Sequence, residues 1–471
     1  MRTLVLVDGE HYPPVVRAAI EHISSRIPGC VVIGAALLGG REKIALDGSF
    51  DVGVALVDGA TPEDAMTAAM ARFAPDLVVN LADQPVVDLR VRMNLVTIAL
   101  LQGVPYQGAD FRFDPPARPH VATKPTVAVI GTGKRTGKTA VSGHLARLLA
   151  ARGSPPLIVA MGRGGPFEPE LVDPATFDLS PKGLVELARS GRHAASDHLE
   201  DALTAGVVTI GTRRCGGGMA GAPVDSTFRE GVIQANTRPE PLLVLEGSGQ
   251  VIPPVHADAT VCVVPATADP RVLTEGLGPY RVLLSDLVVI TMAEASFADS
   301  GAARRETEAT ALQATALQVT ASEGTAVEVA ALAQCVRGVA PGARVVSTVL
   351  RPYPLEPISG RSVLYVTTAP ASAIDLMAGH LEREHGCTVV GTSHHLAHRP
   401  KLAEDLRGAA KADVLLVELK AAAVDLAARF ALERGMEVVF CDNRVVSIGG
   451  DGSFDELALA TADLAVERYQ T

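Results

Sequence analysis

Short apolar runs alternate with longer patterns of helical periodicity along the whole 471-residue chain. Apolar runs of about 4–8 residues are typical of strands buried on both faces of a parallel sheet. The strands predicted on this basis are 4–7, 31–35, 77–81, 126–130, 157–160, 207–210, 242–245, 259–264, 287–291, 363–367, 388–390, 414–418 and 437–441. Helical patterns lie between them, among others at 15–27, 63–73, 89–102 and 140–151. This alternation predicts right-handed crossovers and an α/β fold, with three-layer domains built on mainly parallel sheets.

Two proline-rich stretches, 113–125 and 351–357, divide these segments into three predicted domains. Proline lacks a backbone donor and commonly marks the connections between elements. We therefore expect α/β domains over 1–120, 121–352 and 353–471. The Ala- and Thr-rich stretch 302–325 mixes residues of high and low helix propensity and is left unassigned.

Charge and composition exclude several classes of function. The chain has 42 Lys and Arg against 53 Asp and Glu, and a net charge of −11 argues against broad binding to nucleic acid or anionic membranes. Aromatic residues are only 4% and Trp is missing, so no platform for stacking single-stranded bases is expected. No uncharged apolar run reaches the ~18 residues of a membrane span. The six cysteines are far apart without a CxxC pair, which predicts a cytoplasmic protein with reduced thiols.

A glycine-bearing loop between the strand at 126–130 and the helix at 140–151 predicts a phosphate-binding site. Glycines let backbone N–H groups wrap around a phosphate, and the helix N-terminus adds positive potential. Lys138 is expected to reach the β- and γ-phosphates of a nucleotide, and the Thr139 hydroxyl to bind Mg²⁺. The strict motif has glycine at 132, where this chain has threonine. The residues predicted to bind the nucleotide are Gly131, Thr132, Gly133, Lys134, Arg135, Thr136, Gly137, Lys138 and Thr139.

An acidic residue, Glu246, directly follows the predicted strand at 242–245. Gly247 and Gly249 beside it permit a close approach of the backbone to a ligand. The end of a strand beside a phosphate loop is where an acidic Mg²⁺ ligand belongs. Thr139 and Glu246 are therefore the predicted metal ligands.

Two further loops at strand ends combine arginine with glycine. Arginine offers a planar fork that matches phosphate oxygens, and glycine-rich turns offer backbone N–H donors. In a chain that is acidic overall, arginines concentrated at strand ends predict a small, strongly anionic phosphorylated substrate. The residues concerned are Arg163 and Gly164 in one loop, and Arg213, Arg214, Gly216 and Gly217 in the other.

The outer segments also carry polar residues at strand ends. Asp8, Glu10 and His11 follow the first strand, where ligands of parallel sheets gather, and we assign them to substrate binding. Asn80, Asp83 and Gln84 close a neighbouring strand. In the last segment, His394, His395 and His398 have no zinc-like spacing and are expected to be solvated loop histidines. Four other residues there sit at strand ends and are expected to line a cleft: Glu418, Lys420, Asp442 and Asn443.

The phosphate loop and Glu246 are similar to those of dethiobiotin synthetase and its relatives, the ATPases and GTPases related to the deviant-lysine group. Members of that group often carry a lysine that reaches across a dimer interface, and here Gly133 occupies its usual place. Together with 8–15, 162–166 and 215–221, these motifs resemble cyclic 2,3-diphosphoglycerate synthetases over the whole chain. The resemblance implies an ATP- and Mg²⁺-dependent ligase that closes 2,3-bisphosphoglycerate into a cyclic anhydride and releases ADP and phosphate. It also implies a homodimer.

We accordingly expect 1–120 to be the substrate-binding domain and 121–352 to be the ATP-binding domain. Transfer of a phosphoryl group depends mainly on positioning and charge neutralisation, so the predicted catalytic residues are the cations Lys138, Arg163, Arg213 and Arg214. Two alternatives remain open. One is a carboxylate-activating ligase like dethiobiotin synthetase. The other is a non-catalytic nucleotide switch, for which the guanine-specific Asn-Lys-x-Asp would be expected where this chain has residues 291–294.

Overall fold

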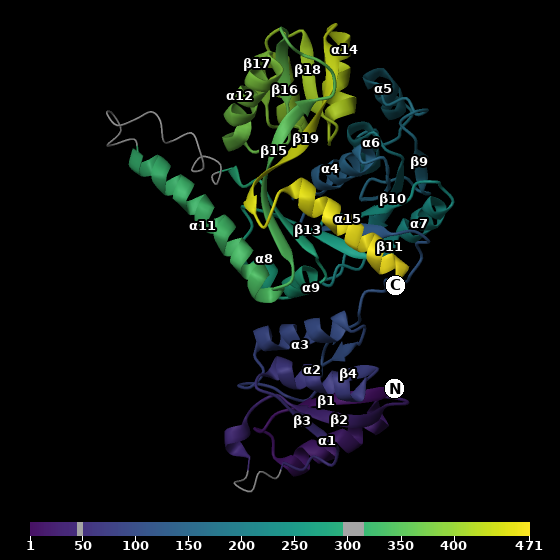
Figure 1. Cartoon of the computed structure of the whole chain (residues 1–471), viewed down its shortest axis with the longest axis vertical. Coiled ribbons are helices and arrows are strands. Elements are labelled where there is room, and N and C mark those ends of the chain that lie inside the picture. The colour runs from purple at the N-terminus through teal and green to yellow at the C-terminus, as the bar shows by residue number, and fades with distance from the viewer. Residues whose placement is uncertain (45–49, 295–314) are drawn as a thin grey trace. The chain divides into compact units, whose positions relative to one another are not determined.

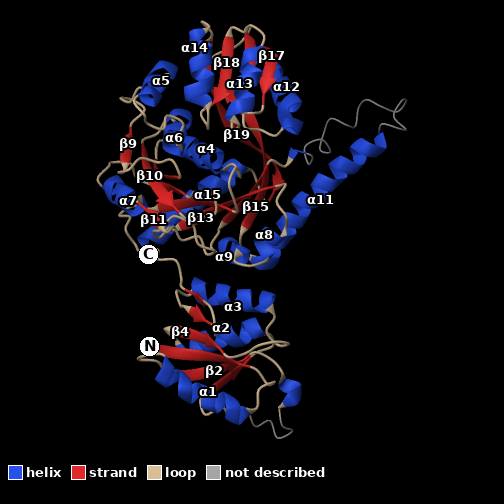
Figure 2. Ribbon diagram, turned by 180° about the vertical axis from the view of Figure 1, so that it is seen from behind, coloured by secondary structure: helices blue, strands red, loops and turns tan. Residues whose placement is uncertain are grey.

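The computed structural model describes residues 1–44, 50–294 and 315–471, which form two compact units (Figure 1). The first unit comprises Met1–Ala117 and Asp269–Leu284, and the second comprises Arg118–Ala268 and Ser285–Thr471. Each unit is built on its own β-sheet, with helices on both faces (Figure 2). None of the described helices has the length and apolar character needed to cross a membrane.

The first unit has a six-stranded sheet of order β3-β2-β1-β4-β5-β6, parallel except for the β5–β6 pair. Its elements are β1 (Arg2–Val7), α1 (Pro13–Arg26), β2 (Val31–Leu37), the 3₁₀ helix η1 (Arg41–Lys43), β3 (Leu56–Asp58), α2 (Pro62–Phe73), β4 (Leu77–Asn80), α3 (Leu89–Leu101), β5 (Tyr106–Gln107), β6 (Arg112–Phe113), α8 (Arg271–Thr274) and α9 (Gly278–Leu283). Successive side chains of a strand point to opposite faces. Val5 and Val7 of β1 thus pack with Val16 and Ile20 of α1 on one face, and α2 and α3 cover the other (Figure 1).

The second unit has a larger sheet of order β11-β10-β8-β12-β7-β13-β14-β15-β19-β18-β16-β17, with β9 paired to β10. Its strands are β7 (Thr126–Gly131), β8 (Leu157–Gly162), β9 (Glu170–Val172), β10 (Thr209–Cys215), β11 (Asp225–Ser226), β12 (Leu243–Glu246), β13 (Ala259–Pro265), β14 (Leu287–Thr291), β15 (Arg344–Pro354), β16 (Ser362–Val366), β17 (Thr388–Ser393), β18 (Val414–Glu418) and β19 (Glu437–Gly450). The pairs β10–β11, β9–β10 and β15–β19 are antiparallel, and the others are parallel.

The helices of the second unit cover both faces of this sheet. They are α4 (Lys138–Ala151), α5 (Pro181–Arg189), α6 (Asp197–Ala205), α7 (Phe228–Asn236), α11 (Thr315–Val339), the 3₁₀ helix η2 (Ala371–Ala373), α12 (Ile374–His385), α13 (Arg399–Gly408), the π-helix η3 (Ala423–Ala428), α14 (Arg429–Glu433) and α15 (Phe454–Gln470). The last helix, α15, returns to the region of β7. Its Phe454 packs in one core with Val127 of β7 and Val141 of α4.

The mainly parallel α/β architecture predicted from the alternating pattern is confirmed. The predicted strands all appear, most of them with shifted ends, but the sequence analysis missed the short strands β3, β5, β6, β9 and β11. It also missed the long strand β15 and gave β19 only its first residues. These two long strands pair over Val346–Gly450 to Pro354–Cys441 and join both parts of the larger sheet. The prolines of the stretch predicted as a boundary, Pro352 and Pro354, lie inside β15. They are tolerated because β14 pairs only with Arg344–Ser347, so this end of β15 has β19 as its one neighbour.

The three-domain division stays a prediction. In the structure, β15, β19 and α15 join 121–352 to 353–471 in one sheet and one core. The part of 302–325 that the structure describes, from Thr315, is helical and belongs to α11.

Replacement of Phe454 by alanine tests whether α15 stabilises the core of the phosphate-loop region. We expect Phe454→Ala to lower the free energy of unfolding by about 3–5 kcal/mol, because the ring is fully buried in that core. Tyr469→Ala, at an exposed position of the same helix, should change it by less than about 0.5 kcal/mol. Denaturant unfolding followed by circular dichroism measures both, and equal effects would show that α15 packs elsewhere.

Candidate functional site

The candidate site lies in the second unit, where β7, β8, β10 and β12 end. These strands are parallel neighbours, so their carboxyl ends meet at one edge of the sheet. Ligands of parallel α/β sheets bind at this edge. The phosphate loop, Glu246 and both arginine-glycine loops all follow these strands.

Lys138 is folded back under the phosphate loop. Its ammonium Nζ donates to the Gly133 carbonyl at 2.8 Å and to Thr136 Oγ1 at 3.3 Å, and the residue is only 8% exposed. Burial lowers the pKa of Lys138, while Glu246 and Asp197 act in the opposite direction. A methyl group on Gly131 would lie 3.1 Å from Nζ. Because Gly131 at the end of β7 has no Cβ, the Lys138 ammonium has room to lie inside the loop.

The backbone of the loop is held by its neighbours before any ligand binds. Thr291 at the end of β14 donates its hydroxyl to the Thr136 carbonyl at 2.7 Å, and Gln250 Nε2 donates to the Thr132 carbonyl at 2.8 Å. Gly137, with φ +88°, begins α4 without a side-chain cap. Gly137 therefore leaves the first N–H groups of α4 able to donate to a phosphate. Phosphate binds in this way at many helix N-termini.

Thr139 and Glu246 are in direct contact. The Thr139 hydroxyl donates to Glu246 Oε1 at 2.9 Å. Glu246 is 3% exposed, and its other oxygen, Oε2, has no hydrogen-bond partner among the described residues. Burial raises the pKa of Glu246. A buried carboxylate oxygen without a partner beside a hydroxyl is a donor set that suits a hard cation such as Mg²⁺.

Two acidic residues that the sequence analysis missed lie on α6. Asp201 is 0% exposed, and neither carboxylate oxygen has a partner within the part of the chain described. Burial, followed by the neighbouring Glu246, raises the pKa of Asp201 well above its usual range. Asp197, one turn earlier, acts electrostatically on Lys138, Arg214 and Glu246. In the sequence, these two acids are four residues apart, which places them on one face of a helix. They were missed because they do not follow a strand.

Arg163 and Arg214 flank the glycine turn that follows Glu246. Arg214 Nη2 donates to the Ser248 carbonyl at 2.8 Å. A methyl group on Gly249, which has φ +63°, would lie 3.1 Å from Arg163 Nη2 and 3.2 Å from Arg214 Nη2. Two guanidinium groups thus converge beside Glu246, although they come from different strands. Such convergence of like charges is stable when an anion lies between them.

Arg213 does not join these residues. Its guanidinium is paired with Asp225, donates to the Phe167 carbonyl at 3.0 Å, and stacks on the Phe167 ring at 4.9 Å. Adjacent residues of a strand point to opposite faces, so Arg213 and Arg214 of β10 cannot face the same ligand directly. A role for Arg213 in binding or catalysis stays a prediction, and its contacts favour a structural one.

The predicted glycines lie around the two arginines. Arg214 Nη1 donates to the Gly216 carbonyl at 3.0 Å, and a methyl group on Gly217 would lie 2.9 Å from Val251. Gly164 lies against the ring of His193, 3.5 Å from where its Cβ would be. Cys215 is exposed at the end of β10, where it pairs with Asp225 of β11.

In the first unit, Asp8 organises the loop that follows β1. Its Oδ1 accepts from the backbone N–H groups of Glu10 and His11, and from His11 Nδ1 at 2.8 Å. Its Oδ2 accepts from the Asp83 N–H at 3.1 Å. The hydrogen bond to Asp8 raises the pKa of His11. The structure therefore brings His11 and Asp83 together around a buried Asp8, while the substrate role of Asp8, Glu10 and His11 stays a prediction.

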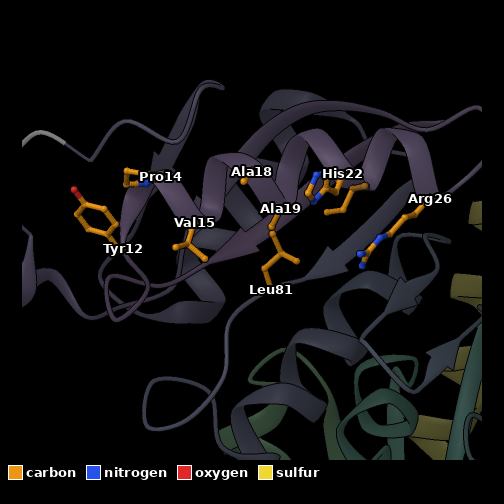
Figure 3. A pocket seen from close by; sticks show the side chains of 9 residues that line it. Tyr12, Pro14, Val15, Ala18, Ala19, His22, Arg26 and Leu81 are labelled. Carbon is orange, nitrogen blue, oxygen red and sulfur yellow. The ribbon is translucent and has the colours of Figure 1, made fainter.

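A cavity of about 600 Å³ runs along α1 of the same unit (Figure 3). Its walls are mostly apolar, with Val15 and Leu81 directed into it and His22 and Arg26 towards one end. An apolar wall offers few donors to a phosphate, so we do not assign the phosphorylated substrate to this cavity.

The histidines of the last segment have ordinary partners. His395 Nδ1 contacts Asp405 at 2.8 Å, and the ring of His394 lies tilted against that of His395, with centroids 3.9 Å apart. His398 begins α13, and its Nδ1 accepts from the Lys401 N–H at 3.3 Å. His394 and His398 are exposed, as expected for loop histidines.

Comparison with known proteins gives matches along nearly the whole chain. Three family models match, described as the N-terminal domain (residues 2–114), the P-loop domain (126–321) and the C-terminal domain (354–444) of cyclic 2,3-diphosphoglycerate synthetase. The models meet near the two proline-rich stretches of the sequence.

Curated relatives named cyclic 2,3-diphosphoglycerate synthetase are similar to the chain over their full length. The protein of Rubrobacter xylanophilus is 44% identical over 460 residues, covering 98% of each chain. That of Methanothermus fervidus is 37% identical over 479 residues, covering 100% of this chain and 98% of the relative. That of Thermococcus gammatolerans is 42% identical over 457 residues, covering 95% and 94%. These matches confirm the family resemblance predicted from the motifs.

Removal of the Lys138 ammonium tests the phosphate loop. We expect Lys138→Ala to abolish turnover and to weaken ADP binding, because the phosphates lose their main positive partner, while the folded structure persists. Calorimetry with ADP and thermal unfolding measure the two effects separately. Lys134→Ala, an exposed residue of the same loop, is the control and should retain more activity. Near-native turnover in Lys138→Ala would contradict the assignment.

Proposed function

This chain belongs to the cyclic 2,3-diphosphoglycerate synthetase family, and on that premise we propose that it closes 2,3-bisphosphoglycerate into cyclic 2,3-diphosphoglycerate with ATP. The observation that carries the proposal is the gathering of three cations at this sheet edge. Lys138 acts on Glu246, which binds Thr139, and Arg163 and Arg214 converge on Gly249 in the turn after Glu246. An ATP-dependent synthetase with an anionic substrate binds two anions, the nucleotide and the acceptor, and needs cations for both at one sheet edge. Lys138 serves the nucleotide phosphates, and the two arginines serve the acceptor.

The chemistry follows from the charge of the reacting groups. A substrate phosphate is a good nucleophile and a poor electrophile, because its own oxygens repel attack. One of its oxygens attacks the γ-phosphorus of ATP, the bond to the β–γ bridging oxygen breaks, and ADP leaves. The second substrate phosphate then attacks the first phosphorus, the transferred group leaves as inorganic phosphate, and the ring anhydride is closed. Both steps need positioning and neutralisation more than covalent help.

This chain's residues supply those two needs. Lys138 lies under the loop with its ammonium on the Gly133 carbonyl and the Thr136 hydroxyl. Thr291 and Gln250 hold the loop backbone through the Thr136 and Thr132 carbonyls. Arg163 and Arg214 hold the acceptor by charge-assisted hydrogen bonds. Since a phosphate is already ionised near pH 7, no strong general base is required.

We further propose that Thr139 and Glu246 hold Mg²⁺. The fit rests on the oxygen character of both groups and on the unpartnered, buried Oε2 of Glu246. When bound, Mg²⁺ neutralises charge on the β- and γ-phosphoryl oxygens. Asp197 adds negative potential around Glu246, which further favours a cation there.

Two observations weigh against a guanine-specific switch. The position expected for the guanine motif has Thr291, whose hydroxyl holds the loop, and Glu294, whose carboxylate pairs with Arg351 at 3.0 Å. Neither residue is available to read a guanine base. A homodimer is also proposed on the basis of the family alone, and a cytoplasmic location on the basis of the cysteine pattern.

Phosphorus NMR of the reaction products tests the proposed activity. The full chain is incubated with ATP, Mg²⁺ and 2,3-bisphosphoglycerate, and a cyclic anhydride should give resonances distinct from those of the open bisphosphate. ATP hydrolysis that does not depend on the bisphosphate would favour a nucleotide switch. Phosphate release with a carboxylic substrate instead would favour the carboxylate-activating ligase.

The metal proposal predicts a specific defect in Glu246→Gln. We expect the Mg²⁺ concentration for half-maximal activity to rise roughly tenfold or more, the factor that about 1.4 kcal/mol produces, because an amide is a weaker ligand for a hard cation. Glu240→Gln is the matched control, since Glu240 is also buried but pairs with Arg238. Superimposable Mg²⁺ titrations of Glu246→Gln and wild type would leave Glu246 without a metal role.

The different placement of the two neighbouring arginines predicts different effects on binding. Arg214→Ala should weaken 2,3-bisphosphoglycerate binding by about 1.5–3 kcal/mol, the worth of a charged hydrogen bond. Arg213→Ala should weaken it much less, because Arg213 is committed to Asp225 and Phe167. ADP affinity should change little in either variant. Calorimetry on the two ligands separates the cases, and a loss for ADP alone would move Arg214 to the nucleotide.

A further inference from the structure

The strand β18 ends in a buried carboxylate, Glu418, that accepts hydrogen bonds on both of its oxygens. Glu418 is buried, and its Oε1 accepts from the Thr367 hydroxyl at 2.5 Å and from Asn443 Nδ2 at 3.0 Å. Its Oε2 accepts from the Thr368 hydroxyl at 2.7 Å. Burial raises the pKa of Glu418, but Lys420 and, after it, these hydrogen bonds outweigh burial and lower the pKa. Lys420, two residues later, makes its closest ion pair with another carboxylate.

That partner lies on α6, the helix that faces the phosphate loop. Lys420 Nζ contacts Glu200 Oε1 at 3.1 Å. Glu200 stands between Asp197 and Asp201 in sequence, and Asp201 adjoins Glu246. The side chain of Lys420 is 31% exposed, and its ammonium touches this acidic helix.

Lys420 shares an electrostatic neighbour with two other cations of the site. Asp197, on the same helix as Glu200, acts on Lys138, on Arg214 and on Lys420. Burial opposes the charge of Lys420, but Glu200 and Glu418 outweigh it and raise the pKa of the ammonium. Lys420 is therefore a charged group at the edge of the phosphate-loop site.

The backbone around Lys420 is also unusual. Ala421, which follows it, has φ +48°, a left-handed conformation that a residue with a Cβ rarely adopts. Strain of this kind persists where the surroundings over-determine it, commonly at ligand sites. Ala421 and Ala422 line a cavity of about 470 Å³ whose polar side chains are His193, His398 and Arg399, with no carboxylate among its described lining residues. His193 lies against Gly164, next to Arg163.

We propose that Lys420 binds a phosphate of the acceptor substrate, exchanging Glu200 for that phosphate when the substrate enters. The inference rests on the proposed function and deepens it, because it makes the last segment of the chain part of the acceptor site. A phosphate carries about −1.5 to −2 charges near pH 7 and attracts an ammonium more strongly than one carboxylate does. The released Glu200 is buried, and burial raises its pKa to about 8, so it can take up a proton when the lysine leaves.

The test compares Lys420→Met, Lys420→Arg and Glu200→Gln in the full chain, with 2,3-bisphosphoglycerate and ADP titrated separately by calorimetry. Lys420→Met should weaken bisphosphoglycerate binding about tenfold or more and leave ADP binding within about twofold. Lys420→Arg should restore most of the affinity. Glu200→Gln should retain or increase it, because the lysine is freed. Lys411→Met, an exposed lysine of the same segment, is the control and should bind like wild type.

A loss in Glu200→Gln as large as that in Lys420→Met would show that the ion pair is only structural and would overturn the inference. Equal losses for ADP and bisphosphoglycerate would overturn it as well. If wild type and Lys420→Met bind bisphosphoglycerate equally and wild type forms the cyclic product in phosphorus NMR, this inference alone fails. If wild type neither binds bisphosphoglycerate nor forms the cyclic product, the proposed function fails. Thermal unfolding of each variant identifies any that do not fold.

Discussion

The burial of Lys138 under its own loop is the constraint on which the rest of the site depends. An ammonium that is 8% exposed must be held by acceptors that do not neutralise it, and the Gly133 carbonyl and Thr136 hydroxyl meet this need. Those two groups keep their places because Thr291 and Gln250 hold the loop from neighbouring strands and turns. Neither group neutralises the ammonium of Lys138, so its charge can be paired with a phosphate.

The same edge of the sheet holds more buried carboxylates than its cations can satisfy. Glu246 and Asp201 adjoin each other, and three of their four oxygens have no partner among the described residues. Buried acids of this kind are costly unless they gain a proton or a cation. This explains why burial raises the pKa of both groups, and why a metal cation fits the arrangement.

The last third of the chain is part of this arrangement and not an appendage. β15 and β19 continue the phosphate-loop sheet, and α15 packs into its core. Arg147 of α4 pairs with Asp442 of β19 at 2.9 Å, while Lys420 after β18 pairs with Glu200 of α6. Both helices that border the phosphate loop are therefore fixed to strands that lie some 200 or more residues later in the chain. Such buried or half-buried pairs specify position more than they add stability.

The sequence by itself determined the parallel α/β architecture, the phosphate loop and the family. Apolar runs, glycine spacing and an acid after a strand are local patterns, and their meaning does not depend on distant residues. The tertiary structure alone decided which charges meet. It separated Arg213 from Arg214 by strand alternation, and it brought Asp201 to Glu246 and Lys420 to Glu200 through helix α6. It also decided that β15 continues past Pro352 and Pro354. The second half of β15 pairs with β19 on one edge but not with β14 on the other, so the prolines are tolerated there. Contacts between residues far apart in sequence depend on how elements pack, and no local pattern records that packing.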